Sequence, residues 1–175
     1  MARRLLFVCH ANIVRSAAAE LLSRGCADPE GGWRFRSAGI GALVGRGVDE
    51  PIGRLLEGRG IDTSGHSAEQ VSRGLVREAD LILTFEAVQR AWVLNEEPQA
   101  RVKTLTVRRA ARLLSRIPRR ADPLAFLAAD DAPYDHSDDF DDPFGGGLPA
   151  AARALVDLDG LLAVILPGID ATSRR

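Results

Sequence analysis

Cysteine, net charge and long apolar segments are all scarce in this chain, and each shortage excludes a class of protein. Only 2 of its 175 residues are cysteine, which excludes a disulfide scaffold and leads us to expect a reducing, cytoplasmic compartment. The formal net charge of -1 favours neither nucleic acid nor an anionic membrane as a partner. No stretch approaches the roughly 20 apolar residues that span a bilayer. The apolar run after Arg3 and Arg4 is too short to predict a signal peptide.

The sequence also lacks internal repeats and metal-ligand patterns. No group of histidine, cysteine and acidic residues has the spacing of a metal site, so we expect no metal and no other cofactor. A length of 175 residues with 46% hydrophobic and 27% charged residues is typical of a globular protein with one core. We therefore expect a single domain over residues 1–175, present as a monomer or weak dimer.

Short apolar runs alternate with helical patterns along the chain. The apolar runs predict four buried strands, at Leu5–Val8, Trp33–Ser37, Ala79–Thr84 and Val102–Leu105. Apolar residues at helical spacing predict helices at Ser16–Arg24, from Pro51 to about Gly58, through Asn95, at Thr106–Ile117 and at Leu148–Leu166. The alternation predicts a three-layer α/β fold, in which a central four-stranded parallel sheet has helices on both faces.

The residues best suited to catalysis or ligand binding lie where the first predicted strand ends. That strand stops at Cys9 and an alanine-rich helix begins near Ser16, so Cys9 lies in a strand-to-helix turn. Such a turn directs backbone N–H groups and the positive end of a helix dipole at one point, where they bind an oxyanion and stabilise a thiolate. Arg15 can bind two phosphate oxygens, and Ser16 can donate its hydroxyl to the thiolate. The alternative is a core cysteine beside a surface arginine.

Cys9, Arg15 and Ser16 form a C-x5-R-S motif with Asn12 inside it and Glu20 after it. This arrangement resembles the low-molecular-weight protein tyrosine phosphatase family, whose loop reads C-x-G-N-x-C-R-S and precedes a helix containing A-E. The resemblance implies a phosphate-binding loop made of His10, Ala11, Asn12, Ile13 and Val14. Alanine replaces the family glycine at position 11, where glycine can take a backbone conformation that alanine resists. Valine replaces a frequent second cysteine at position 14.

Two further segments resemble family motifs that support this loop. Ser37 begins an S-A-G segment, and the resemblance implies that its side chain supports the phosphate loop. His66 lies in a stretch similar to G-I-D-x-x-x-H-x-A, which starts at Gly60. In the family this histidine hydrogen-bonds the loop asparagine, here Asn12. Without the resemblance, His66 would be interpreted as a cap or surface residue.

A D-P-aromatic motif of the family has its counterpart in the segment 141–145. The resemblance assigns the role of general acid to Asp142, because among the neighbouring aspartates 139, 141 and 142 only Asp142 precedes a proline. Proline biases the preceding residue toward an extended conformation, which can direct the carboxylate into a cleft. Asp139 and Asp141 are the alternatives for this role, and an acidic surface loop is the other interpretation of the motif.

The expected walls of the cleft carry little aromatic surface. Counting from Ser37 places Leu43 on one wall, where an aliphatic side chain weakens stacking on a phenyl ring, and Phe144 lies on the other. The segment 118–139 is longer than its family counterpart and strongly acidic. We hypothesise that it forms a lid or side wall of the cleft, since long loops in compact domains are often functional. The predicted helix before it has a basic face, which favours a solvated surface over docking of an acidic partner.

The resemblance implies a phosphomonoester hydrolase, above all a protein-tyrosine-phosphatase. Cys9 would attack phosphorus to form a phosphocysteine, while Arg15 and the loop amides stabilise the transferring group. Asp142 would protonate the leaving oxygen and then act as the base for the attacking water. Ser16 would assist departure of the thiolate. The substrate would be a tyrosine-phosphorylated protein or a small phosphomonoester.

Two rival functions use the same loop. A thioredoxin-coupled arsenate reductase needs a placed resolving cysteine, and Cys26, the only other cysteine, is expected to be a structural thiol. A non-catalytic, anion-binding regulatory protein would retain the loop without turnover. Ala11, Val14 and the small aromatic surface keep this second rival open.

Overall fold

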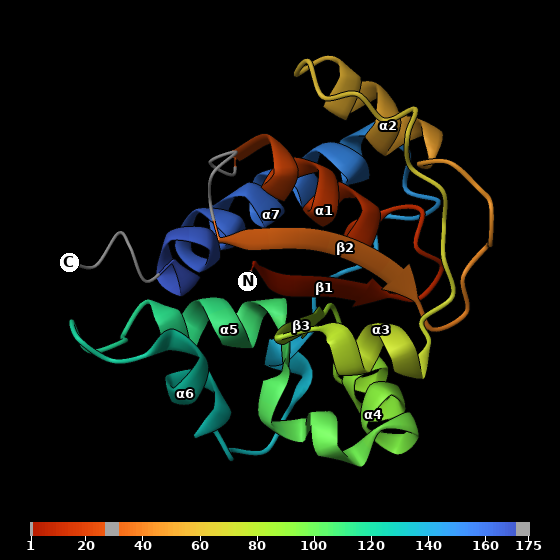
Figure 1. Ribbon diagram of the computed structural model, residues 1–175. Helices are drawn as coiled ribbons and strands as arrows, with labels where there is room; N and C mark the ends of the chain where they lie inside the picture. Colours follow the sequence, from red (N-terminus) through yellow and green to blue (C-terminus); the bar gives the residue numbers. More distant parts are fainter. Residues whose placement is uncertain (1, 27–31, 171–175) are drawn as a thin grey trace.

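The computed structural model describes residues 2–26 and 32–170 and is organised around one parallel sheet (Figure 1). Its strands are β1 (Arg3–Cys9), β2 (Trp33–Gly39), β3 (Leu81–Thr84) and β4 (Thr104–Thr106). They lie in the order β2-β1-β3-β4, and every pairing is parallel. The predicted fold with a central four-stranded parallel sheet is confirmed.

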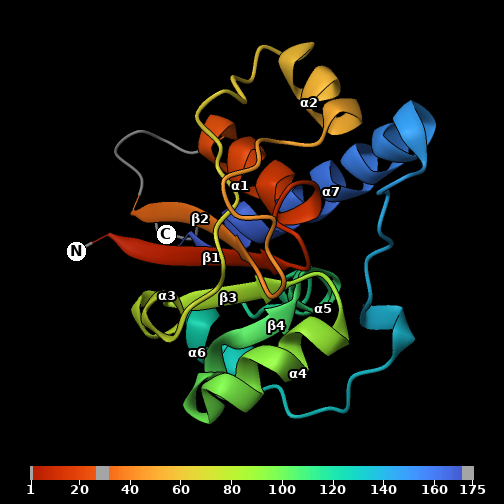
Figure 2. The same ribbon diagram turned by 90° about the vertical axis from the view of Figure 1, so that its right-hand side faces the viewer.

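Helices cover both faces of this sheet (Figures 1 and 2). One face is covered by α1 (Arg15–Cys26), α5 (Val107–Leu114) and α7 (Gly147–Ile169), and α2 (Glu50–Glu57) packs on α7. The other face packs against α3 (Arg73–Glu78) and α4 (Ala87–Glu96). The short helix α6 (Pro123–Ala128) contacts α5 and α7. None of the helices formed by residues 2–26 and 32–170 is long and apolar enough to cross a membrane.

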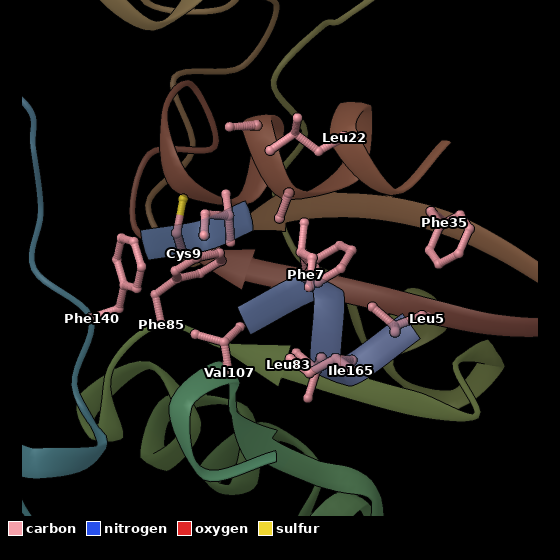
Figure 3. Packing of buried hydrophobic residues seen from close by; sticks show 14 of the residues in the cluster. Leu5, Phe7, Cys9, Leu22, Phe35, Leu83, Phe85, Val107, Phe140 and Ile165 are labelled. Carbon is pink, nitrogen blue, oxygen red and sulfur yellow. The ribbon is translucent and has the colours of Figure 1, made fainter. Parts of the chain in front are cut away.

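Strand β1 divides the core because its side chains alternate between the two faces. Leu5, Phe7 and Cys9 enter the larger cluster, which includes buried residues of α1 and α7 (Figure 3). Leu6 and Val8 enter the smaller cluster beside α3 and α4. All five side chains are at most 3% exposed, and burying each large one contributes up to about 1.5–3 kcal/mol. The loop that follows Cys9 therefore starts from a central strand that is buried on both faces.

The boundaries of several elements differ from the prediction. The fourth strand is Thr104–Thr106 rather than Val102–Leu105, because a 3-10 helix at Pro98–Lys103 occupies the residues before it. Helix α5 ends at Leu114 instead of Ile117, and α7 continues to Ile169. Helix α3 was not predicted; its six residues are too few for a clear period in the sequence.

The segment 118–139 is not a structureless loop. It contains α6, whose first turn is capped by Asp122, with its side chain accepting a hydrogen bond from the Ala125 nitrogen at 2.8 Å. Pro123 starts the helix and Leu127 is buried in the larger cluster. A 3-10 turn at His136–Asp138 follows. The segment is therefore part of the packed structure.

The basic face predicted for the region of α5 is only partly solvated, since Arg112 and Arg116 are exposed as predicted but Arg109 is not. Arg109 is 3% exposed and forms ion pairs with Asp130 and Asp138, two acidic residues of the segment 118–139. The sequence presents the two charged stretches as separate surfaces, whereas in the fold they neutralise each other.

Candidate active site

The loop from Cys9 to Arg15 connects β1 to α1 at the carboxyl edge of the sheet, where ligands of open α/β sheets commonly bind. The Cys9 sulfur is buried among polar partners, because the Asn12 backbone nitrogen donates to it at 3.3 Å and the Ser16 hydroxyl lies at 3.0 Å. Both contacts suit a sulfur that carries negative charge. The loop thus holds the sulfur at the start of a helix, as the sequence predicts.

Asn12 is the centre of the hydrogen bonds that hold the loop. Its side-chain nitrogen donates to the Ser16 and Ser37 hydroxyls, both at 2.9 Å, and its side-chain oxygen accepts from the Glu69 nitrogen at 2.8 Å. The His66 Nε2 lies 2.8 Å from the Asn12 carbonyl oxygen. The two residues expected to support the loop, Ser37 and His66, therefore both contact Asn12 directly.

The backbone conformation of the loop shows whether alanine fits at position 11. Within residues 2–26 and 32–170, Asn12 is the one non-glycine residue with positive φ, at 58°, and asparagine tolerates this left-handed conformation well. Ala11 does not adopt it, so alanine in place of glycine introduces no strain of that kind. The backbone conformation that alanine resists is therefore not required at position 11 of this chain.

The segment after β2 braces the loop from behind. Backbone nitrogens of Ile40, Gly41, Leu43 and Asp49 donate to four loop carbonyls, those of Cys9, His10, Ala11 and Ile13, at 2.8–3.1 Å. These bonds occupy the carbonyl oxygens, which would otherwise repel an anion. Gly39 permits the close approach, since a Cβ there would lie within 3.0 Å of the His10 oxygen, closer than real Cβ atoms come. The brace is thus built from backbone, and a glycine makes room for it.

Arg15 is almost completely buried, with 3% of its surface exposed, and is held by three acceptors. Its guanidinium donates to Asp142 Oδ2 at 2.7 Å, to the Phe140 carbonyl at 3.2 Å, and to the Glu86 carboxylate. Sequence reasoning did not assign Glu86 to the site. The available signal was its position directly after β3, because carboxyl ends of parallel strands meet at one edge of the sheet.

These residues line a pocket of about 220 Å³. The wall consists of Cys9, His10, Ala11, Ile13, Val14, Arg15, Gly41, Leu43, Asp142 and Phe144. The expected wall residues Leu43 and Phe144 are thus both present, whereas Asn12, Ser16, Ser37 and His66 do not line the pocket. None of the residues 118–139 lines the pocket, so the hypothesis that this segment forms a lid or side wall is wrong. Its residues pack against α4 and α5 instead.

The structure separates Asp142 from its neighbours. Asp142 lines the pocket with Cys9, whereas the Asp139 side chain accepts a hydrogen bond from the Ala87 nitrogen at the start of α4. Asp141 lines a different depression, on the side of α7. Of the three aspartates, only Asp142 shares a pocket with the cysteine.

The chemistry open to this pocket is that of a thiol, a guanidinium and a carboxyl group. No three histidine, cysteine or acidic side chains lie close enough to hold a metal ion in the part of the chain that is described. Cys26 is an exposed thiol at the last position of α1, about 16 Å along the helix from its start. That distance from Cys9 makes it unsuitable as a resolving thiol.

Comparison with known proteins gives consistent matches. The family model for low molecular weight phosphotyrosine protein phosphatase matches residues 4–118. The low molecular weight protein-tyrosine-phosphatase Wzb of Escherichia coli strain K12 is 40% identical over 106 residues, which are 60% of this chain and 69% of that protein. Wzb of Salmonella typhi is 35% identical over 111 residues, or 60% of this chain and 68% of that protein.

Solved structures extend the match over nearly the whole chain. The tyrosine phosphatase Wzb from Escherichia coli K30 in complex with sulphate has a TM-score of 0.68 at 26% identity, covering 92% of this chain and 94% of that one. The YwlE arginine phosphatase from Geobacillus stearothermophilus has a TM-score of 0.72 at 24% identity, covering 93% and 90%. The second of these shows a shared fold alone.

Proposed function

The chain belongs to the low molecular weight phosphotyrosine protein phosphatase family, and we propose that it hydrolyses phosphotyrosine in proteins through a phosphocysteine on Cys9. Membership of this family makes it a phosphatase. The observation that carries the proposal is that the Cys9 sulfur, the Arg15 guanidinium and the Asp142 carboxylate line one pocket of about 220 Å³. These are the nucleophile, the phosphate ligand and the acid that the reaction requires.

In the first step the Cys9 thiolate attacks phosphorus and the bond to the phenolic oxygen breaks. Arg15 and the backbone amides of the loop stabilise the charge on the three equatorial oxygens. The proton of the Asp142 carboxyl group moves to the leaving oxygen. Binding of the phosphate group gives Arg15 a new anionic partner, which releases Asp142 from the 2.7 Å ion pair to face that oxygen.

In the second step water attacks the phosphocysteine. Asp142, now a carboxylate, accepts a proton from this water, and inorganic phosphate leaves as the bond to sulfur breaks. The electron pair returns to Cys9, whose thiolate is stabilised by the Ser16 hydroxyl at 3.0 Å and the Asn12 nitrogen at 3.3 Å. The enzyme is restored with its acid protonated and no oxidant, reductant or metal consumed.

The walls of the pocket support an aromatic phosphoester bound at a protein surface. Leu43 and Phe144 flank the entrance and are 43% and 62% exposed, so a phenyl ring between them would cover apolar surface that water now contacts. The curated relatives Wzb are named protein-tyrosine-phosphatases. A small phosphomonoester is the other substrate class that such a pocket admits.

The proposal is tested by steady-state hydrolysis of para-nitrophenyl phosphate and of a phosphotyrosine peptide, in buffer containing a metal chelator. We expect turnover of both by the parent, no turnover by Cys9→Ser, and a loss of at least about 100-fold in kcat for Asp142→Asn, the range typical of a general acid. Mass spectrometry after acid quenching should find phosphate on the peptide that contains Cys9.

Two outcomes would change the assignment. A parent that hydrolyses a sugar phosphate far better than the peptide would move the substrate to the small-molecule class while keeping the mechanism. A folded parent that binds inorganic phosphate but turns over neither compound would refute the proposed reaction and support a regulatory, anion-binding role.

A further inference from the structure

Three consecutive residues just before the proposed acid are fixed by the rest of the fold. Asp138, Asp139 and Phe140 connect the 3-10 turn at 136–138 to the acid-bearing residues 141–143, along a path that runs past α4 toward the start of α7 (Figure 2). Asp138 is 1% exposed and Phe140 is 2% exposed. We name residues 138–140 the anchor.

The first residue of the anchor is held by the arginines of α5. One Asp138 oxygen accepts from Arg109 at 3.1 Å and the other accepts from Arg112 at 2.6 Å. Arg109 is itself fixed from the opposite side by Asp130, through two hydrogen bonds of 2.9 and 3.0 Å, and its guanidinium stacks on the Tyr134 ring at 4.4 Å. Asp138 is therefore a buried anion in a cluster with fixed geometry.

The other two residues of the anchor are held by the start of α4, by Phe85 and by Arg15. The Asp139 side chain accepts from the Ala87 nitrogen at 2.7 Å. The Phe140 nitrogen donates to the Phe85 carbonyl at 2.7 Å, and the two rings pack edge to face at 5.5 Å, at the same end of the core as Cys9 (Figure 3). The Phe140 carbonyl then accepts from Arg15 at 3.2 Å. The anchor thus joins α5 to Arg15, the proposed phosphate-binding residue.

Asp142 has far fewer supports than the anchor. Its side chain is 43% exposed, and its contacts are Arg15 and the nitrogen of its own neighbour Phe144, at 3.2 Å. Because Arg15 is the group that phosphate engages, this contact cannot position the acid during the reaction. The remaining restraints are the hydrogen bond from the Phe144 nitrogen and the short connection to the anchor.

A buried ion cluster is poorly explained by stability alone. Desolvation of buried charges offsets much of their attraction, and such clusters are best attested where one arrangement must be specified. Here the cluster fixes the residue from which the acid-bearing turn departs. Catalytic groups need support of this kind, since a displacement of about 1 Å can cost about 100-fold in rate.

We propose that Asp138, through Arg109 and Arg112, is a positioning residue for the general acid. It touches neither substrate nor Cys9; it sets where the Asp142 carboxyl group lies when Arg15 is occupied by phosphate. This inference rests on the proposed function, because it assumes that Asp142 protonates the leaving oxygen.

The test is the dependence of kcat/KM on the leaving group. Phenyl phosphate releases a phenol with a pKa near 10 and needs the acid, whereas dinitrophenyl phosphate releases a much more acidic phenol and does not. For Asp138→Asn we expect a loss of about tenfold in kcat/KM with phenyl phosphate and less than about twofold with dinitrophenyl phosphate. The ratio of the two losses is independent of how much of the sample is folded.

Asp130→Asn is the matched control. It removes one carboxylate from the same Arg109 cluster, with a similarly low exposure of 12%, but lies in the segment before the 3-10 turn and outside the anchor. We expect Asp130→Asn to change the substrate ratio less than Asp138→Asn does, because Asp138 keeps its bonds to both Arg109 and Arg112. Arg112→Gln provides a second variant, since Arg112 is 41% exposed and its loss should leave the fold intact while changing the substrate ratio in the same direction as Asp138→Asn.

The same series separates the inference from the proposed function. If Asp142→Asn shows no preference for the acidic leaving group, Asp142 is not the acid and the proposed function fails. If Asp142→Asn shows the preference and Asp138→Asn does not, or Asp130→Asn shows it equally, the positioning role alone is refuted. In the double variant with Asp142→Asn, Asp138→Asn should add no further selectivity, because the group that it positions has been removed.

Discussion

A single methyl group added at Gly39 should disable the phosphate loop. The Cβ of alanine would lie 3.0 Å from the Asn12 nitrogen and 3.1 Å from the Ala11 carbonyl carbon, and closer still to the His10 oxygen. Ordinary contacts begin near 3.4 Å, so the loop must recede by about 0.4 Å at Asn12 and by more at His10. Gly39 itself cannot move away, because its nitrogen and oxygen are both bonded at 2.9 Å, to Glu69 and Val71.

The loop must therefore absorb the displacement. Overpacking of a rigid site typically costs about 1–3 kcal/mol, and we expect the free energy of unfolding of Gly39→Ala to fall by about 2 kcal/mol. A shift of the loop amides by a large fraction of an ångström should lower kcat/KM by about 100-fold. Steady-state hydrolysis of para-nitrophenyl phosphate measures the activity, and urea unfolding followed by tryptophan fluorescence measures the stability.

Gly25→Ala supplies the matched control for this prediction. It makes the same chemical change near the end of α1, where a Cβ meets nothing within 4 Å. Alanine there should leave the activity unchanged and raise the stability by up to about 1 kcal/mol. If Gly39→Ala retained parental activity and stability, the loop would have to be compliant, and the account of backbone bracing would be wrong.

Three further predictions concern Glu86, Tyr134 and Cys26. Glu86→Ala should remain folded but lose about tenfold in kcat/KM, because Arg15 loses a carboxylate that orients it; parental steady-state kinetics would contradict this. Burial raises the pKa of Tyr134, with Arg90 and Arg109 opposing the shift. Since the chain contains 1 tyrosine, an ultraviolet absorbance titration should show one phenol midpoint above the ordinary value of about 10, and a midpoint at or below that value would refute the burial. The stability that the neutral phenol contributes is complete below about pH 10 and is lost as pH rises through the raised pKa. Cys26→Ser should change the unfolding free energy by less than about 0.5 kcal/mol and leave turnover unaffected, because Cys26 is exposed. A loss of turnover would instead support a disulfide relay between Cys9 and Cys26.

The sheet and the loop could be predicted from the sequence because both depend on local patterns. Parallel strands buried on both faces appear as short apolar runs, and β1 and β3 were found within two residues of their true ends. The residues around Cys9 were found because the motif keeps Cys9 and Arg15, the proposed nucleophile and phosphate-binding residue, within one loop. His66 and Ser37 could be placed only through the family resemblance, since their contacts with Asn12 join distant parts of the chain.

The failures share a physical cause, which is that charge pairing is non-local. The basic residues of α5 were predicted to be a solvated face and the acidic segment 118–139 a lid or side wall, because a single sequence does not reveal that Arg109 and Asp138 bury one another. For the same reason the sequence did not reveal that Glu86 pairs with Arg15. The sequence left open whether alanine at position 11 is strained, because it does not reveal that the left-handed residue is the neighbouring Asn12.

The order of the sheet has a consequence for how the protein is made. Strand β1 is the first to be synthesised, yet it lies between β2 and β3, and the last ligands of Arg15 come from Phe140 and Asp142. A nascent chain that has emerged only as far as α5 could form all four strands, while holding Arg15 through Glu86 alone. Pairing between parts so distant is slow to form, and translation adds only about 5–20 residues per second. Cys9 therefore leaves the ribosome long before Phe140 and Asp142, and Arg15 gains its full set of acceptors only when these later residues fold back onto the sheet.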